Sequence, residues 1–181
     1  MKFEELSIPG AWLIKPELVI DDRGVFRRHF CAREFASHGI VTAVAQGNVS
    51  ENPHLYTLRG FHFQTPPHGE GKTISCIRGA VFDIIVDLRP DSATFLKWTS
   101  VTVSAENRES LHVPAGCANA YLTMQPDTIV HYYMTEFYEP GSYGGFNYRD
   151  PRFKFEWPAT PRLISEKDKS LPNFDVDWIG R

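Results

Sequence analysis

The sequence is poor in cysteine. It contains three, Cys31, Cys76 and Cys117, and no two of them form a C-x-x-C pair. An odd number of widely spaced thiols predicts neither a disulfide framework nor a zinc knuckle. We expect each cysteine to be a small apolar side chain in the interior.

The sequence also lacks long hydrophobic runs and a large excess of one charge. Residues 1–6 include two acidic side chains where a secretory signal has an apolar run, and no later stretch reaches the length of a membrane span. The formal net charge is -3, with lysines and arginines scattered along the chain. This distribution excludes a basic surface for nucleic acid or an anionic membrane. We expect a soluble, cytoplasmic protein that acts on a small molecule.

Helical periodicity is nearly absent. It appears over residues 32–38, before Gly39, and residues 165–168 resemble the start of a second short helix. The rest indicates a mostly β protein, an antiparallel sandwich or barrel with short flanking helices. We expect one domain over residues 1–181, ending in a turn-rich segment from about residue 158. Strands are predicted over residues 10–14, 24–30, 41–50, 58–64, 72–78, 80–88, 97–104, 108–113, 119–123, 128–135 and 145–147.

One predicted strand, residues 80–88, has two different faces. One face is wholly apolar and carries Phe82, Ile84, Val86 and Leu88. The other face combines two carboxylates with apolar side chains, those of Asp83, Asp87, Val81 and Ile85. Because side chains alternate along a strand, this segment can pack a core with one face and line a cavity with the other.

The most informative segment runs from Arg59 to Pro67 and is followed by Lys72. It sets the imidazole of His62 and the ammonium of Lys72 ten residues apart across a proline-containing loop, so that two neighbouring strands could aim both at one small molecule. An imidazole can accept a proton near neutral pH, and an ammonium stabilises an oxygen that becomes negative. The pattern indicates a base and a charge stabiliser at one site.

A set of short motifs, in order over about residues 21–168, resembles the dTDP-4-dehydrorhamnose 3,5-epimerase family. The motifs are Asp22-Arg23-Gly24-Val25-Phe26, Arg59-Gly60-Phe61-His62-Phe63-Gln64, Gly71-Lys72, Gly79-Ala80-Val81-Phe82-Asp83, Val86-Asp87-Leu88-Arg89, Ser92-Ala93-Thr94-Phe95, Ser104-Ala105-Glu106-Asn107, Val113-Pro114-Ala115-Gly116 and Ile164-Ser165-Glu166-Lys167-Asp168. The resemblance implies a cupin-type jelly roll and a homodimer whose N-terminal strands cross to the partner. It also implies an epimerase of nucleoside-diphosphate 4-keto sugars that needs no metal or other cofactor.

Inversion of a carbon beside a ketone needs three chemical roles. A base removes a proton on one face, a positive group stabilises the enolate oxygen, and an acid returns a proton on the other face. His62 is the candidate base and Lys72 the candidate stabiliser. By resemblance, Tyr132 is the general acid and Asp168 fixes the orientation of His62.

Structural roles compete with these assignments. His62 could be a structural histidine on the sheet, and Lys72 a solvated loop residue. Asp168 also completes a helix-capping pattern that begins at Ser165, and the cap and the contact with the histidine are compatible.

Two adjacent tyrosines raise the same question. Tyr132 and Tyr133 point to opposite sides of a strand, and Tyr132 shares its face with Val130 and Met134. Only one of the two can enter a cavity, and either could simply fill the barrel.

The resemblance also assigns residues to substrate binding. Arg59 and Arg23 match residues that hold the diphosphate, and the planar guanidinium suits bidentate contact with phosphate. Phe26 matches an aromatic residue near the nucleotide base, although a core role is equally open. Further matches on a polar strand and beyond it are Gln46, Asn48, Ser50 and Tyr138.

Several positions depart from the family pattern. Asn119 stands where a histidine is usual, and it can hydrogen-bond a sugar but cannot act as a base. Arg28 replaces a glutamate, Phe63 a tyrosine and Gly47 a polar residue, and the loop over residues 51–56 is slightly longer than usual. We infer that the proton chemistry is kept but acts on a different nucleotide sugar or at only one of the two carbons.

Three other functions compete with this one. A metal-dependent cupin could draw ligands from His62, His68 and Glu70, but Asn119 occupies the place of a further histidine ligand. A sugar-nucleotide ketoisomerase on the same barrel would use similar enolate chemistry and move the carbonyl. A non-catalytic sugar-nucleotide-binding protein would not need to keep base, acid and lysine together.

Overall fold

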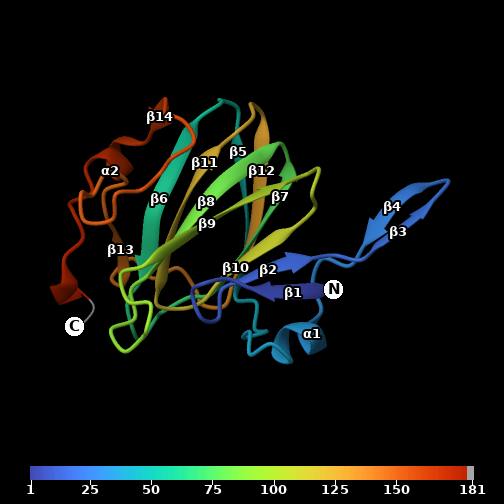
Figure 1. The fold of residues 1–181 in the computed structure, drawn as a ribbon, viewed down its shortest axis with the longest axis horizontal. Helices are drawn as coiled ribbons and strands as arrows, with labels where there is room; N and C mark the ends of the chain where they lie inside the picture. Colours follow the sequence, from blue (N-terminus) through green and yellow to red (C-terminus); the bar gives the residue numbers. More distant parts are fainter. Residues whose placement is uncertain (179–181) are drawn as a thin grey trace.

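Two antiparallel sheets face each other in the computed structural model, which describes residues 1–178 (Figure 1). The first sheet contains, in spatial order, β1 (Lys2–Glu5), β2 (Trp12–Lys15), β10 (Ser110–Val113), β7 (Lys72–Arg78), β12 (Thr128–Met134) and β5 (Gln46–Asn52). The second contains β13 (Tyr143–Gly145), β6 (Thr57–Gln64), β11 (Cys117–Thr123), β8 (Ala80–Asp87) and β9 (Trp98–Ser104), with β14 (Leu163–Ile164) added parallel to β6. The mostly β, jelly-roll prediction is confirmed.

Two apolar clusters hold these layers together. The inner cluster lies between the sheets and includes Ile74, Val81, Ile85, Leu111 and Val130. The outer cluster joins the second sheet to the C-terminal part of the chain and includes Phe61, Ile84, Phe146, Phe153 and Phe174. Strand β8 contributes alternate residues to both clusters, which confirms the predicted division into two faces. The expectation that one of these faces lines a cavity is wrong, because both faces pack apolar clusters and no β8 residue lines the cavity between the sheets. Each fully buried side chain of this size stabilises the fold by about 1.5–3 kcal/mol.

Two short helices and a 3-10 turn flank the sheets. Helix α1 (Ala32–Ala36) packs Phe35 against Ile14, whereas α2 (Glu166–Lys169) and η1 (Val176–Trp178) belong to the C-terminal segment (Figure 1). Within residues 1–178, no helix is long and apolar enough to cross a membrane.

Some element bounds differ from the prediction. Strand β7 has the predicted bounds, but β5 begins at Gln46 rather than at residue 41, and α1 ends at Ala36, before the turn that leads to Gly39. Strand β13 begins two residues before the predicted segment. Strands β1, β3 and β14 were not predicted, because they are four residues long or shorter and alternate weakly or not at all between buried and exposed positions.

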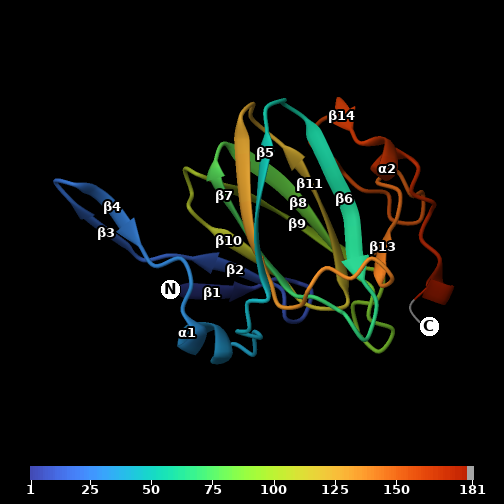
Figure 2. The ribbon, with the colours of Figure 1, turned by 180° about the vertical axis from the view of Figure 1, so that it is seen from behind.

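A two-stranded hairpin projects from the body of the protein near the N-terminus (Figures 1 and 2). This N-terminal arm consists of β3 (Leu18–Asp21) paired with β4 (Gly24–Arg27). Its apolar side chains are exposed, Ile20 to 71% and Phe26 to 70%. Because an isolated two-stranded hairpin is only marginally stable in water, the arm is a candidate contact surface.

Candidate active site

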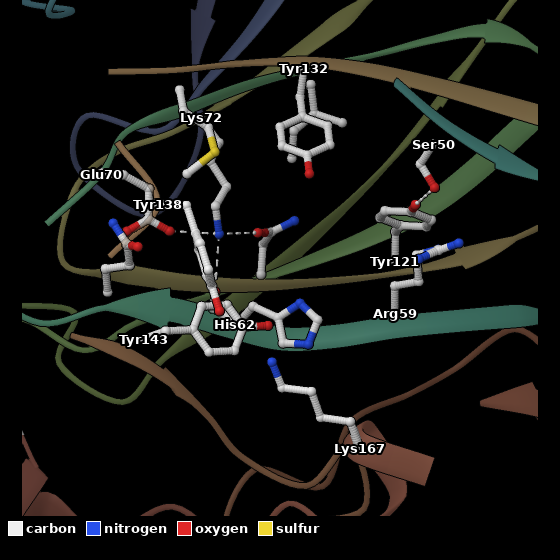
Figure 3. A pocket seen from close by; sticks show the side chains of 14 residues that line it. Ser50, Arg59, His62, Glu70, Lys72, Tyr121, Tyr132, Tyr138, Tyr143 and Lys167 are labelled. Atoms are coloured by element: carbon white, nitrogen blue, oxygen red, sulfur yellow. Dashed lines mark hydrogen bonds and ion pairs between the residues drawn. The ribbon is translucent and has the colours of Figure 1, made fainter. Parts of the chain in front are cut away.

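A cavity of about 340 Å³ opens between the two sheets (Figure 3). Both sheets and the C-terminal segment contribute to its wall. The lining side chains are those of Ser50, Arg59, His62, Gln64, Glu70, Lys72, Ile74, Asn119, Tyr121, Tyr132, Met134, Tyr138, Tyr143 and Lys167. Seven of the predicted site residues therefore line one cavity: Ser50, Arg59, His62, Lys72, Asn119, Tyr132 and Tyr138.

An irregularity in β6 lets Arg59 and His62 face the same cavity. Residues three apart on a regular strand point to opposite faces. Gly60 interrupts the alternation: its φ is +120°, and the pairing of β6 with β11 shifts register beside it. A Cβ on Gly60 would lie 2.5 Å from the Cβ of Ala120, so only glycine fits this close approach. The guanidinium and the imidazole consequently share one wall.

The imidazole of His62 is held by a buried carboxylate. Its Nε2 lies 2.8 Å from Oδ1 of Asp168, while Oδ2 of Asp168 accepts the backbone N–H of Gly60 at 3.3 Å. Burial alone would raise the pKa of Asp168, but the hydrogen bonds from His62 and Gly60 outweigh it and lower the pKa below its ordinary value. A carboxylate in this position fixes both the orientation and the tautomer of the ring.

The same aspartate also belongs to a helix cap. Its backbone N–H donates at 3.1 Å to Oγ of Ser165, the residue that precedes α2. The capping pattern and the contact with His62 therefore coexist, and the cap sets the backbone from which the carboxylate reaches the imidazole.

The ammonium of Lys72 is fixed in the cavity by three acceptors. Nζ lies 2.8 Å from Oε1 of Glu70 and donates to the backbone oxygen of His62 at 3.2 Å and to Oδ1 of Asn119 at 3.3 Å. The side chain is 12% exposed, which excludes the solvated role. A charge held in this way needs little reorganisation when a negative oxygen forms beside it.

Tyr132 approaches from the opposite wall. Strand β12 directs its hydroxyl into the cavity above His62, as Figure 3 shows. Tyr133 points away and packs against His131 and Phe30 on the other face of the sheet. Burial raises the pKa of Tyr132, so its phenol stays protonated at neutral pH. The predicted alternation of the two tyrosines is confirmed.

Most of the predicted binding residues lie at or beside the cavity. Arg59 donates from Nε to Oδ1 of Asn52 at 2.8 Å, and its side chain lines the cavity. Gln46 accepts the backbone N–H of Tyr138, a rim residue that is 47% exposed. Asn48 contacts the sulfur of Met134 at 3.5 Å. Gln46 and Asn48 thus adjoin lining residues without lining the cavity themselves.

Two predicted binding residues are not brought to the cavity within one chain. Arg23 and Phe26 lie on the N-terminal arm, where Arg23 pairs with Asp21 at 2.6 Å. Phe26 is exposed, so the core role left open for it is wrong in this chain taken alone.

Sequence reasoning missed several lining residues. Glu70 was considered only as a metal ligand, and it is the buried partner of Lys72. The ring of Tyr143 lies 5.3 Å from that of His62, and Nζ of Lys167 lies 4.1 Å from the Tyr143 ring centroid. Lys167 could have been found from its place beside Asp168 in the last motif.

The departures from the family pattern occupy different environments. Asn119 lines the cavity, but Phe63 belongs to the outer cluster, and Gly47 faces the ring of Tyr133. Arg28 forms an ion pair with Glu34 of α1 at 3.0 Å. Of the substituted positions, Asn119 is the one that can act directly on a ligand in this cavity.

The metal alternative receives no support from the side-chain arrangement. Over residues 1–178, no group of three or more histidine, cysteine, aspartate or glutamate side chains is suited to hold a metal ion. His68 does not line the cavity that contains His62 and Glu70.

The fold and the cavity together define a jelly-roll cupin whose barrel is lined by ionisable and hydrogen-bonding side chains. Residues 5–175 match the family model described as dTDP-4-dehydrorhamnose 3,5-epimerase. The chain belongs to this family of isomerases.

Individual relatives give the same result. The dTDP-4-dehydrorhamnose 3,5-epimerase of Sinorhizobium fredii is 38% identical over 174 residues, covering 96% of this chain and 89% of the relative. The crystal structure of the enzyme from Bacillus anthracis, with TDP and PPi bound, is 37% identical with a TM-score of 0.92, covering 96% of this chain and 99% of that one. The structure of ChmJ, a 3'-monoepimerase from Streptomyces bikiniensis in complex with dTDP-quinovose, is 34% identical with a TM-score of 0.86, and the match covers 93% of this chain and 85% of ChmJ.

Proposed function

We propose that the protein is an epimerase of a dTDP-linked 4-keto-6-deoxy sugar that inverts C3, C5 or both. Family membership supports the reaction class. The observation that carries the proposal is the contact of 2.8 Å between His62 and Asp168, in a cavity whose wall also holds Lys72 and Tyr132. These four residues supply the base, its orienting group, the charge stabiliser and the acid.

The first step is proton removal by His62. Because Nε2 faces Asp168, the lone pair that accepts the proton is on Nδ1. The proton leaves C3 or C5, each adjacent to the C4 ketone, and the electron pair moves to the ketone oxygen. Asp168 remains ionised and stabilises the imidazolium that forms.

The ammonium of Lys72 then stabilises the negative charge on the enolate oxygen. This ammonium interacts more strongly with a negative oxygen than with a neutral ketone, which lowers the barrier rather than only tightening binding. Glu70 and Asn119 keep Nζ in place.

Tyr132 returns a proton to the opposite face of the carbon. The step converts the enolate to the inverted ketone and leaves Tyr132 as phenolate and His62 as imidazolium. Transfer of one proton from His62 to Tyr132 through solvent restores the starting state. Arg59, which lines the same cavity, makes the phenolate less costly to form.

The nucleotide end of the substrate requires residues beyond the cavity wall. Arg59 would bind the diphosphate, with Gln46, Asn48 and Tyr138 at the rim. We further propose a homodimer in which the N-terminal arm of one copy brings Arg23 and Phe26 to the cavity of the other. The exposed apolar side chains of the arm support this arrangement.

Deuterium exchange tests the function. The protein is incubated in D2O with dTDP-4-keto-6-deoxyglucose and with its CDP and GDP counterparts, and C3 and C5 are followed by NMR. Exchange at both carbons supports a 3,5-epimerase, and exchange at C3 alone a 3-epimerase. A displaced carbonyl would indicate a ketoisomerase, and binding without exchange a sugar-nucleotide-binding protein.

A further inference from the structure

Asp83 is a buried carboxyl group behind the wall of the cavity, and it has no role in the steps above. It lies on the inner face of β8 and is 0% exposed. It does not line the cavity. Among residues 1–178, the carboxyl accepts hydrogen bonds from one side chain: Nδ2 of Asn119 donates to Oδ1 at 3.3 Å and to Oδ2 at 3.2 Å. A buried carboxyl with a single amide partner calls for an explanation.

The other end of the same amide reaches the reacting centre. Oδ1 of Asn119 accepts a hydrogen bond from Nζ of Lys72 at 3.3 Å. An amide has a donating and an accepting end, and the donating end of Asn119 faces Asp83, because Nδ2 lies within hydrogen-bond distance of both carboxyl oxygens. The accepting end must then face Lys72. If the amide turned over, its NH2 would point at an ammonium that also only donates.

We propose that Asp83 is a positioning residue for Lys72 and acts through Asn119. The inference rests on the proposed epimerase function. In this chain an asparagine stands where the family pattern has a histidine. The link between the Asp83 carboxyl and Lys72 is therefore a neutral amide, which orients the ammonium and does not itself titrate. Removing the acceptor at position 83 leaves the amide without its second partner, so that one of the three acceptors that hold the ammonium of Lys72 is no longer fixed in place.

The charge of Asp83 gives the arrangement a pH dependence. Burial raises the pKa of Asp83 to about 8, against smaller opposing effects of Asn119 and Lys72. At pH 7 the carboxyl is therefore mainly neutral, and it still accepts from Asn119 through its carbonyl oxygen. Above pH 8 it adds a second negative charge near Lys72, beside that of Glu70, and weakens the stabilisation of the enolate.

The surroundings of Asp83 contain few other groups that could produce this effect. Across the barrel, β7 contributes Lys72, with Glu70 just before it. On β11, Tyr121 lies opposite Asp83. Burial raises the pKa of Tyr121 above its ordinary value of 10.0, so this phenol does not titrate near pH 8. On β9 the opposite residue is Val101, which does not titrate.

Two substitutions at position 83 separate positioning from mere packing. Asp83→Leu removes the acceptor, and we expect kcat to fall about tenfold with KM within about twofold, as for one lost hydrogen bond of about 1.4 kcal/mol. Asp83→Asn keeps an acceptor and a neutral group, so kcat at pH 7 falls only about twofold and the decline above pH 8 disappears. Asp87→Asn, the same change on the same strand face, should lower stability and keep the wild-type pH profile.

The test continues at the other end of the chain of hydrogen bonds. Asn119→Leu should lower kcat as Asp83→Leu does, and at pH 7 the double variant should be no slower than Asn119→Leu alone, because the mainly neutral Asp83 then acts through the amide. If Asp83→Leu does not fold, Asn119→Leu and the pH profile of Asp83→Asn decide the matter.

The proposal is overturned if Asp83→Leu keeps wild-type kcat, if Asp83→Asn loses as much as Asp83→Leu, if Asp83→Asn retains the alkaline decline, or if KM alone changes. All variants are assayed by deuterium exchange beside the wild type. A wild type that does not exchange at C3 or C5 would instead overturn the proposed function, so the two failures are distinguishable.

Discussion

His62 and Asp168 are 106 positions apart in the chain and are joined at 2.8 Å between Nε2 and Oδ1. The contact links the middle of a barrel strand to a one-turn helix near the C-terminus. In the proposed mechanism it makes the C-terminal segment part of the acid–base machinery, and the same segment belongs to the outer apolar cluster. The catalytic proposal therefore depends on residues that local sequence patterns cannot connect.

Asp168→Asn tests this link. The amide presents donors as well as an acceptor to the ring, so the tautomer of His62 is no longer fixed, and we expect kcat to fall about 100-fold, in the range typical of general-base catalysis. Steady-state kinetics measures the change. Glu166→Gln on the same helix, where the side chain is 89% exposed, serves as the control and should leave kcat within about twofold of wild type. Wild-type kcat in Asp168→Asn would contradict the role.

Tyr132→Phe separates proton removal from inversion. His62 can still take a proton and return it to the same face, so deuterium should continue to enter the substrate. The inverted product should form at least about 100-fold more slowly, because the donor on the other face is missing. NMR follows both in one sample. Tyr133→Phe, on the outer face of the same strand, is the matched control, and equal loss in the two variants would remove Tyr132 as the acid.

Complementation tests the proposed dimer. His62→Ala and the arm variant Arg23→Ala/Phe26→Ala should each be severely impaired. When the two are co-expressed, half of the dimers are mixed, and each mixed dimer has one site with neither defect. Activity should return to about one quarter of wild type. No recovery would mean that the arm does not complete the cavity of the other copy.

Strand alternation and short motifs could predict the placement of part of the proposed acid–base set, whereas the role of Tyr132 as the acid came from the family resemblance. Lys72 is the first residue of β7, as predicted. The two-residue period correctly assigns Tyr132, rather than Tyr133, to the cavity face of β12. The joint position of Arg59 and His62 could not be predicted in this way, since it depends on the irregular backbone at Gly60. The role of Asp168 came from family resemblance, because a contact over 106 positions leaves no local pattern.

The rest of the wall was harder to predict. Glu70 lies in a loop, Tyr143 is the first residue of a three-residue strand, and Lys167 is on a one-turn helix. In such segments side-chain direction is set by tertiary packing rather than by a period. Asn119 was identified as a departure from the pattern, but its connection to Asp83 required the geometry of β8 and β11.

Asp87 should govern part of the acid stability of the fold. Burial would raise its pKa, but hydrogen bonds from Arg89, Ser92 and Thr94 outweigh burial and lower the pKa from 3.8 to about 2. Because the folded pKa is below the unfolded one, the stabilisation is complete above pH 4 and is lost as the pH falls through 2. We expect about 2 kcal/mol of the free energy of unfolding to disappear over this window.

Denaturant unfolding between pH 5 and pH 2 measures this loss. In Asp87→Asn the protein should be less stable at pH 5 and its stability should vary less between pH 4 and pH 2. An unchanged acid dependence in this variant would assign the loss to other carboxylates.

The central claim is that His62 removes the proton beside the ketone. The most direct measurement is deuterium exchange at C3 and C5 of dTDP-4-keto-6-deoxyglucose by His62→Ala, with binding of dTDP measured in parallel. We predict exchange at least about 1,000-fold slower than in the wild type with dTDP affinity retained. Exchange at the wild-type rate in a folded His62→Ala protein would contradict the claim.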